Sequence, residues 1–446
     1  MESFPRGLAE IEDCQCTRDS RWNCRYKIVA MQPPGPVDVT LALALRPYQK
    51  TIVSTLWSAG MLRRVLSLGP ELQVQDPRDD GSLEVIKRFP VHKLSNRLLW
   101  GIWRRLPRKT FRHPPIAPTL WLADSLLSNW IEPTAILHAS TAFCLSSIRA
   151  AKGKGAVTLV ESGTRHPRLW RQSALEECRR FGVDDLEGGA GLPDFLIRRM
   201  DREFQTCDWI VVPSNVARQS FSEMGHGDKT VVVLPGVDTQ FFSPPPRPVE
   251  APLFRACYMG RVQVTKGVGY LLQAWKRLAL PGAELVLIGE VSPDIQPFLK
   301  TYVDSSVRIV ERMSPEEIAA CYRESSLFVF PSVSEGLAEE LLEAMASGLP
   351  IVASDMSGAT DCIVNGEQGW IVPTRDVDAL ADAIRWCFKN PNESRAMGLA
   401  ARARIEDQFT LVHYNQRLIA CYKALVGRSQ TALTDEHAQM SQSQRN

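Results

Sequence analysis

Two glutamates, Glu335 and Glu343, first indicate chemistry by their type and spacing. Glu335 follows the apolar run Leu327–Phe330 and the turn-like pair Pro331-Ser332, and Glu343 lies about two turns into an expected helix. The first carboxylate is therefore expected at a strand–loop–helix junction, where open α/β sheets bind ligands. Because carboxylates accept hydrogen bonds from hydroxyls and a helix N-terminus attracts anions, the pair suits a polyhydroxylated ligand that carries phosphate.

The loop from Gly260 to Gly267 is a second candidate, because it follows an expected strand and opens an expected helix. Arg261 and Lys266 stand near its two ends. Two cations at a helix entrance, with glycines that allow close approach, suit a diphosphate. An ordinary basic surface loop is the alternative. The diphosphate interpretation gains support from the Glu335 segment, which lies three strands later in the same expected sheet.

The acidic helix that begins near Glu339 has two interpretations. It could present a solvated face that includes Glu339, Glu340 and Glu343. Its apolar side chains, however, indicate that the helix is buried: Leu341, Leu342 and Met345. A buried carboxylate needs a partner, and a ribose-like diol would supply one to Glu343.

In the first half of the chain, the polar loop Glu161–Pro167 follows the expected strand Ala156–Val160. His166 could donate a hydrogen bond to a phosphate or a sugar hydroxyl, and Arg165 could do the same. A loop histidine without any ligand fits the sequence equally well. His138, at the end of another expected strand, is interpreted as structural.

Residues 85–123 contain no acidic residue, and their basic side chains alternate with apolar ones such as Trp100 and Trp103. Basic residues beside Trp and Leu are what a segment at an anionic lipid surface requires. We therefore expect this segment to contact a membrane. A solvated basic helix and an acceptor-binding loop are the alternatives.

The bulk composition describes an ordinary globular protein of 446 residues, long enough for two domains. The net charge of +2, from 52 basic and 50 acidic residues, argues against a general nucleic-acid binder. The cysteines lack metal-site spacing, which favours free thiols in a reducing cytosol. Neither a signal sequence nor an apolar run of about eighteen residues is found. The expected location is the cytoplasm, peripheral to the inner face of the cell membrane.

Short apolar runs alternate with helical patterns in both halves, which predicts parallel sheets covered by helices on both faces. The first half includes an expected strand at Val37–Leu45 and a helix at Gln49–Leu68. The predicted division is an irregular lead-in over residues 1–36, an N-terminal Rossmann-like domain over 37–240, a Pro-rich linker over 241–253, a C-terminal Rossmann-like domain over 254–410, a helix over 411–426 that packs back toward the N-terminal domain, and a disordered tail over 427–446.

These residues resemble a known family. The run from Glu335 to Glu343 resembles the E-x7-E signature of retaining glycosyltransferases of family 4, the glycosyl transferases of group 1, which have the GT-B fold. Gly260-Arg261 through Lys266-Gly267 resembles the diphosphate loop of that family, and Leu234–Asp238 resembles its interdomain stretch. The similarity covers residues 208–425 well and the first half loosely.

The resemblance implies an α/β protein of two Rossmann-like doubly wound domains facing a central cleft. It implies that the C-terminal domain holds a nucleotide-diphosphate sugar, with Arg261 and Lys266 at the diphosphate, Glu335 at the sugar hydroxyls and Glu343 at the ribose. His166 would lie near the transferred sugar. The remaining donor-binding positions would be Gly260, Gly336, Leu337 and Ala338. Neither a cofactor nor a metal is expected, because the two cations take the place of the metal.

The sequence departs from the family at two places. Leu337-Ala338 stands where Phe-Gly is usual, and Asp361 stands near a position where glutamate is common. The predicted activity is retaining sugar transfer to a saccharide or lipid-linked saccharide acceptor, in surface polysaccharide or glycolipid assembly. The alternatives are a sugar-nucleotide epimerase or phosphorylase of the same fold, and a catalytically silent nucleotide-sugar-binding protein.

Overall fold

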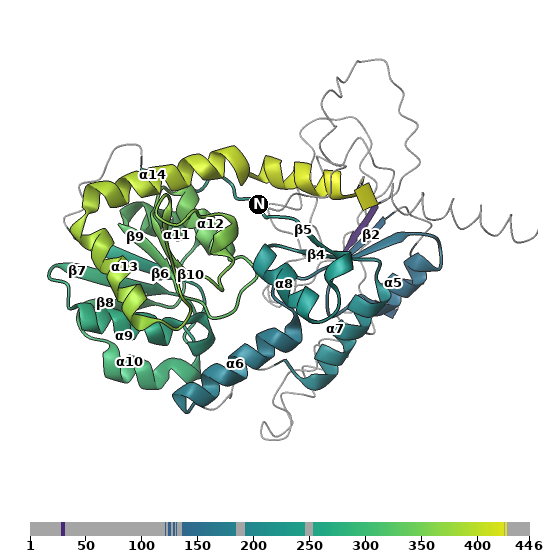
Figure 1. Ribbon diagram of the computed structural model, residues 1–446, viewed down its shortest axis with the longest axis horizontal. Helices are drawn as coiled ribbons and strands as arrows, with labels where there is room; N and C mark the ends of the chain where they lie inside the picture. The colour runs from purple at the N-terminus through teal and green to yellow at the C-terminus, as the bar shows by residue number, and fades with distance from the viewer. Residues whose placement is uncertain are drawn as a thin grey trace, which may run out of the picture.

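The computed structural model describes residues 28–31, 121, 124–125, 128–129, 131, 136–183, 192–245, 253–422 and 424–425. Four sequence predictions lie outside these residues: the strand at 37–45, the helix at 49–68, nearly all of the basic segment 85–123, and the tail 427–446. The described residues form two α/β halves side by side (Figure 1). None of the described helices is long and apolar enough to cross a membrane.

The N-terminal sheet is parallel, and its described strands follow the order β1-β2-β3-β4-β5. These strands are β1 (Ile28–Met31), β2 (Ile136–Ser140), β3 (Val157–Glu161), β4 (Trp209–Val212) and β5 (Thr230–Val232). The helices between them are α5 (Leu145–Lys152), α6 (Pro167–Phe181), α7 (Asp194–Thr206) and α8 (Asn215–Glu223). Buried apolar residues dominate β2 and β3, as expected for a sheet covered on both faces.

Strand β1 corrects one expectation, because residues 1–36 were expected to be irregular. Ile28–Met31 pairs in parallel with Ile136–Ala139 of β2. The Pro-rich run that follows, Pro33–Pro36, dominated the interpretation of this region. The four apolar residues before it are enough for a short strand once a partner strand is present.

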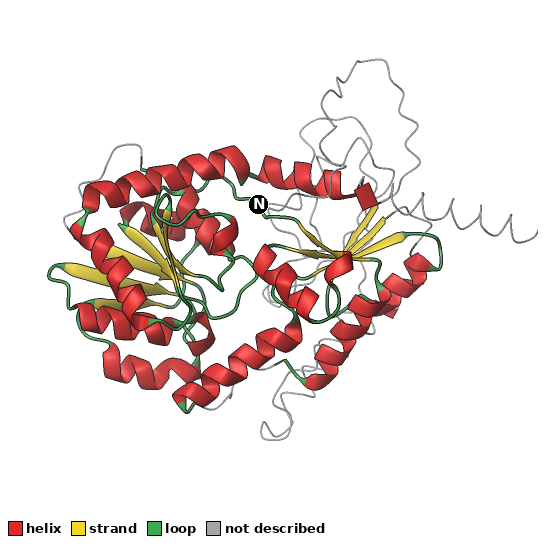
Figure 2. Cartoon of the chain, viewed as in Figure 1, coloured by secondary structure: helices red, strands yellow, loops and turns green. Residues whose placement is uncertain are grey.

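The C-terminal sheet is also parallel and has the order β11-β10-β9-β6-β7-β8. Its strands are β6 (Phe254–Met259), β7 (Ala283–Ile288), β8 (Val307–Val310), β9 (Leu327–Phe330), β10 (Ile351–Ser354) and β11 (Gly369–Val372). Its helices are α9 (Val268–Leu278), α10 (Gln296–Tyr302), α11 (Pro315–Glu324), α12 (Glu339–Ala346), α13 (Val377–Lys389) and α14 (Pro391–Gln408). Helices lie on both faces of this sheet (Figure 2). Within this sheet the polypeptide begins at β6 in the middle and adds β7 and β8 on one side. It then returns to place β9, β10 and β11 on the other side, so the strand order reverses between β6 and β9.

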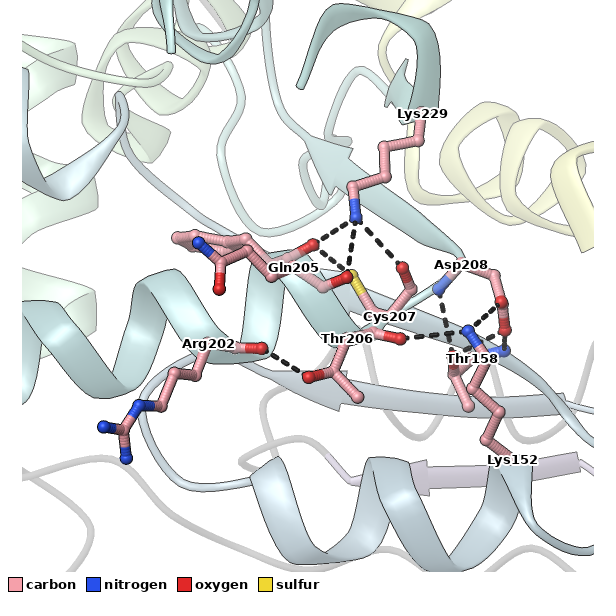
Figure 3. A network of polar contacts seen from close by, with 9 residues as sticks. Lys152, Thr158, Arg202, Gln205, Thr206, Cys207, Asp208 and Lys229 are labelled. Atoms are coloured by element: carbon pink, nitrogen blue, oxygen red, sulfur yellow. Dashed lines mark hydrogen bonds and ion pairs between the residues drawn. The ribbon is translucent and has the colours of Figure 1, made fainter. Parts of the chain in front are cut away.

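The end of helix α7 is fixed by a polar network, which Figure 3 shows. Lys229 donates to the carbonyl oxygen of Cys207 at 3.1 Å and to that of Gln205 at 3.4 Å. Asp208, two residues after the helix, accepts from the backbone N–H of Thr158 at 2.9 Å and pairs with Lys152 at 2.5 Å. These bonds satisfy carbonyls that a helix end leaves without partners, and they tie α7 to strand β3.

Residues 411–422 and 424–425 are helical, and we call them the C-terminal helix. Figure 1 shows this helix continuing from α14 toward the N-terminal half. Its buried side chains Leu418 and Tyr422 belong to one apolar cluster with Leu159 and Val211 of the N-terminal sheet. The last helix of the chain therefore completes the core of the first half.

Helix α6 crosses between the halves in the opposite direction (Figure 1). Phe181, at its end, packs on the rings of Tyr270 and Phe298 with centroid distances of 5.1 and 4.7 Å. Glu177, which is fully buried, accepts from the Tyr270 hydroxyl at 2.8 Å and from Arg375 Nε at 2.5 Å. Helix α6 thus belongs to the N-terminal half by sequence and to both halves by packing.

Candidate functional site

The candidate site lies where the strand order of the C-terminal sheet reverses. The loop 260–267 follows β6 and the loop 331–338 follows β9, so the two loops emerge from adjacent strands. Ligands of open α/β sheets bind in the crevice at such a switch point. This location brings together the two segments that the sequence singled out.

Lys266 and Glu335 form an ion pair across the switch point. Lys266 lies 5.7 Å above the Phe330 ring, and the hydroxyl of Ser332 donates to Glu335 Oε1 at 3.0 Å. The two side chains keep 22% and 12% of their surface exposed. Both charges therefore remain accessible to a ligand while being held in place by their neighbours.

The backbone at Gly267 explains why the two loops lie so close. Gly267 has a φ of 72°, in the left-handed region that favours glycine. A Cβ at this position would overlap the carbonyl oxygen of Pro331. Only glycine therefore allows the loop after β6 to approach the loop after β9, and this approach puts Lys266 beside Glu335.

Arg261 lies near the start of the same loop, directly after Gly260, whose φ is 129°. Its Nη2 atom is 3.9 Å from Glu290 Oε1, and its side chain is 37% exposed. Its Nε atom is buried and has no hydrogen-bond partner among the described residues. The guanidinium is thus loosely held by a single exposed carboxylate.

Glu343 lies in the second turn of α12 and has a different environment from Glu335. Its Oε2 atom accepts from the Tyr322 hydroxyl at 3.3 Å. Burial, followed by the charges of Glu340 and Glu339, raises the pKa of Glu343 to about 8. The carboxyl is therefore mostly protonated at neutral pH, so it can both donate to a diol and accept from it.

Leu337 and Ala338 are buried, each 6% exposed. Ala338 is the N-cap of α12, and its side chain makes no capping bond, so the first N–H groups of this helix depend on other partners. The preceding Gly336 touches the other half of the molecule: its carbonyl accepts from Ser214 Oγ at 2.6 Å. The segment 336–338 therefore forms part of the boundary between the halves.

The first half contributes Arg165 to this boundary. Arg165 Nη1 donates to Ser334 Oγ, next to Glu335, at 3.2 Å. The residue is 9% exposed, and burial lowers the pKa of its guanidinium. From their residue types alone, Arg165 and His166 could have had the same role, and the structure brings only Arg165 to the C-terminal loop.

His166 points into the N-terminal half and is 1% exposed. Its ring packs against Phe204 and Phe221 at 5.5 and 5.0 Å, and its Nδ1 atom accepts from the backbone N–H of Arg168. Burial lowers the pKa of His166 to about 4, against an opposing effect of Asp201. His166 is therefore a neutral cap of α6, and none of its described contacts joins it to Lys266 or Glu335.

Asp361, one of the two departures from the family pattern, lies at the same boundary. It accepts from the backbone N–H of Asn215, at the start of α8, at 2.9 Å, and Asn215 Nδ2 also donates to it. Burial raises the pKa of this carboxyl. Over the described part of the chain, no cluster of three His, Cys, Asp or Glu side chains could hold a metal ion.

Comparison with known families gives a match to the model of the glycosyl transferases group 1 over residues 246–404. This stretch contains the loop 260–267, the loop 331–338 and helix α12. The family model therefore covers the C-terminal half, which holds all the predicted site residues except His166.

Three curated relatives extend this similarity. A lipopolysaccharide core biosynthesis mannosyltransferase of Rhizobium leguminosarum is 31% identical over 52% of this chain and 67% of its own length. An alpha-maltose-1-phosphate synthase of Mycolicibacterium smegmatis is 26% identical over 72% of this chain and 87% of its own length. A capsular polysaccharide biosynthesis glycosyltransferase of Staphylococcus aureus is 28% identical over 39% of this chain. The chain spans only about half, 47%, of that last protein.

Solved structures give the fold. The sucrose-phosphate synthase of Thermosynechococcus elongatus superposes with a TM-score of 0.64 at 17% identity, over 91% of this chain and all of that protein. The Anabaena protein HepE, solved in complex with UDP, superposes with a TM-score of 0.60 at 16% identity, over 89% of this chain and all of HepE. The two facing parallel α/β domains have the GT-B arrangement, which confirms the predicted fold class.

Proposed function

This chain belongs to the glycosyl transferases of group 1, and we propose that it moves a sugar, with retention of configuration, from a nucleotide-diphosphate sugar to a saccharide or lipid-linked saccharide acceptor. The observation that carries the proposal is the Lys266–Glu335 pair at the switch point. It sets a cation for phosphate beside a carboxylate for sugar hydroxyls. In a nucleotide-diphosphate sugar, the anomeric carbon joins the sugar ring to the phosphate. The donor therefore presents a phosphate and sugar hydroxyls close together at this point.

In this proposal Lys266 and Arg261 bind the diphosphate, Glu335 accepts from hydroxyls of the donor sugar, and Glu343 binds the ribose. The bond between the anomeric carbon and the diphosphate oxygen breaks, and the acceptor oxygen bonds to the same face of that carbon. The acceptor proton passes to the leaving diphosphate. The two cations stabilise the charge that develops on it, which is preorganised electrostatic catalysis without a metal.

The similar proteins support this choice of substrates. HepE was solved with UDP, and two relatives act in lipopolysaccharide core and capsular polysaccharide biosynthesis. We extend these to a role in surface polysaccharide or glycolipid assembly. Attachment to anionic membrane through residues 85–123 completes the proposal, and salt-sensitive co-sedimentation with anionic vesicles tests that attachment.

The test begins with UDP-glucose and GDP-mannose in thermal-shift measurements, because a ligand that binds only the folded state raises the melting temperature. The donor that shifts it is then incubated with octyl α-mannoside, a soluble glycolipid mimic. We expect a glycoside product with the α-configuration. Epimerised donor formed without any acceptor would contradict transfer, and so would donor binding with neither transfer nor hydrolysis.

The variant Lys266→Ala tests the assignment of the site. We expect it to lose turnover, because the leaving diphosphate loses its better placed cation. Lys300→Ala is the matched control, since Lys300 is an exposed lysine of the same domain. Near-normal transfer by Lys266→Ala would contradict the proposed site.

A further inference from the structure

A chain of three polar side chains runs from the C-terminal helix into the N-terminal sheet. The hydroxyl of Tyr422 lies 2.6 Å from Nδ1 of His138, and Nε2 of His138 lies 3.3 Å from Oε2 of Glu161. Tyr422 and His138 are 3% and 1% exposed, whereas the Glu161 side chain keeps 25% of its surface. The series Tyr422–His138–Glu161 thus begins in the core and ends at a partly exposed carboxylate.

The protonation of His138 follows from its two neighbours. A carboxylate only accepts hydrogen bonds, so a bare Nε2 facing Glu161 Oε2 would set two lone pairs against each other. Nε2 therefore carries a proton, and the Tyr422 hydroxyl satisfies Nδ1. Nε2 and Glu161 Oε2 lie at ion-pair distance, but neither atom has a hydrogen-bond partner among the described residues. The carboxylate of Glu161 thus sits beside His138 and receives no hydrogen bond from any described residue.

Glu161 lies at the boundary between the two domains. It is the last residue of β3, and two residues later the carbonyl oxygen of Gly163 touches Gly336 of the C-terminal domain. The charge of Glu161 also helps to raise the pKa of Glu339, the first residue of α12, after the desolvation of that carboxyl. Although Glu339 as a whole residue is exposed, its carboxyl is influenced by the charge of Glu161 in the opposite domain.

A structural role alone does not account for this arrangement. A buried Tyr–His pair needs an acceptor for the remaining imidazole proton, and a backbone carbonyl or a fully buried side chain would provide one. Here the neighbour of Nε2 is a charged, partly exposed carboxylate that receives no hydrogen bond from any described residue, at the carboxyl end of strand β3. Proteins hold substrate-binding groups in place through supporting neighbours of this kind.

We propose that Glu161 is a further substrate-binding residue, which accepts a hydrogen bond from a sugar hydroxyl through Oε1, and that His138 and Tyr422 are positioning residues that hold it. The hydroxyl belongs either to the transferred sugar or to the acceptor. This inference rests on the proposed function. It places a specificity determinant in the first domain, opposite Lys266 and Glu335.

The experiment compares Glu161→Gln, Tyr422→Phe and the double variant, each as the full chain. Glu161→Gln keeps the size of the side chain and removes its charge. We expect it to bind UDP within about twofold of the unmodified protein and to lower kcat/KM for transfer about tenfold or more. Tyr422→Phe should lower transfer about fivefold, because Glu161 keeps its charge but loses its support.

The double variant separates positioning from mere stability. If Tyr422 acts through Glu161, then Tyr422→Phe has no further effect on transfer in the Glu161→Gln background, although it still lowers the melting temperature. An equal loss in both backgrounds would overturn the positioning role. Glu284→Gln and Tyr302→Phe are matched controls, since Glu284 lies near the opposite end of the strands and Tyr302 packs on Phe298.

Donor hydrolysis in the absence of acceptor identifies the source of the hydroxyl. Equal losses of hydrolysis and transfer in Glu161→Gln assign the contact to the donor sugar, and a loss of transfer alone assigns it to the acceptor. Transfer by Glu161→Gln within twofold of the unmodified protein would overturn the inference, as would an equal loss of UDP affinity. An unmodified protein that neither transfers nor hydrolyses any donor would instead overturn the proposed function.

Discussion

The ammonium group of Lys266 contacts the carboxylate of Glu335 across the point where the strand order of the C-terminal sheet reverses. A diphosphate that binds Lys266 must therefore share this cation with Glu335. Glu335 and a bound diphosphate would thus compete for the positive charge of Lys266. In the proposed complex a sugar hydroxyl that donates to Glu335 would relieve this competition, so we expect the whole donor to bind better than its nucleotide part alone.

Replacing Glu335 with Gln should separate these two effects. Without the competing carboxylate, Lys266 is freer, and we expect UDP to bind as tightly as to the unmodified protein or a few times more tightly. Transfer should fall about a hundredfold, because the sugar loses its charged acceptor. Calorimetry with UDP and a transfer assay measure the two quantities. Glu316→Gln, at an exposed carboxylate of α11, is the control, and weaker UDP binding to Glu335→Gln alone would contradict the competition.

The contact between Gly336 and Gly163 provides a second prediction. A Cβ on Gly336 would overlap the carbonyl oxygen of Gly163 and approach Pro213 Cγ to 2.8 Å, so Gly336→Ala must push the halves apart. Gly163→Ala is the matched control, because a Cβ on that side meets nothing within 4 Å. We expect the first variant to lose transfer about tenfold or more and the second to retain it. Equal activity of the two would show that the approach of the halves has no part in turnover.

The raised pKa of Glu343 makes a prediction about stability. Its folded-state pKa is about 8, above the usual 4.5, so the folded protein holds this proton more tightly. The stability from this group is complete below about pH 4.5 and is lost as the pH rises through 8, by at most about 1.4 kcal/mol per pH unit. Glu343→Gln should remove this part of the pH dependence. Melting temperatures from pH 5 to 9 test it, and parallel curves for the two proteins would contradict it.

His166 should have the opposite dependence. Its folded-state pKa is about 4, below the usual 6.5, so the unfolded chain takes up a proton first as the pH falls. Stability is therefore lost on acidification from about 6.5 to 4. Asn can replace His166 as a helix cap without titrating. Between pH 7 and 5, we expect the melting temperature of His166→Asn to fall less than that of the unmodified protein. We also expect the variant to keep its transfer activity. Abolished transfer with an intact fold would instead support the catalytic role predicted from the sequence.

The sequence predicted the C-terminal sheet well, because each of its strands is a short buried run between turn residues. The strand β8 and the helix α13 have the predicted ends. Helix α6 was missed. Its exposed arginines interrupt the apolar periodicity, and part of its apolar surface faces the other domain rather than its own sheet. Helix α14 was missed as well, although it packs on α12, α13 and β11 of its own domain.

Within the candidate site, the sequence predicted that Lys266 and Glu335 lie close together because their loops follow strands of one expected sheet, and the structure pairs the two side chains. The family resemblance favoured His166 over the adjacent Arg165, whereas the structure brings Arg165 to Ser334. The choice is made by the backbone, which turns into α6 at His166 and uses that ring as a cap. The chain Tyr422–His138–Glu161 was not predicted, because nearly the whole fold separates its ends in sequence.

Helix α6 and the C-terminal helix each pack on the half of the molecule that lies on the other side of the linker. This packing limits which halves of related proteins can be joined into one functional chain. A hybrid joined at the linker, with the first half of one relative and the second half of another, would pair Phe181 with a foreign Tyr270–Phe298 surface. It would also fill the first core with a foreign Tyr422. A hybrid keeps both packing interfaces intact only if each crossing helix is inherited together with the surface that it covers.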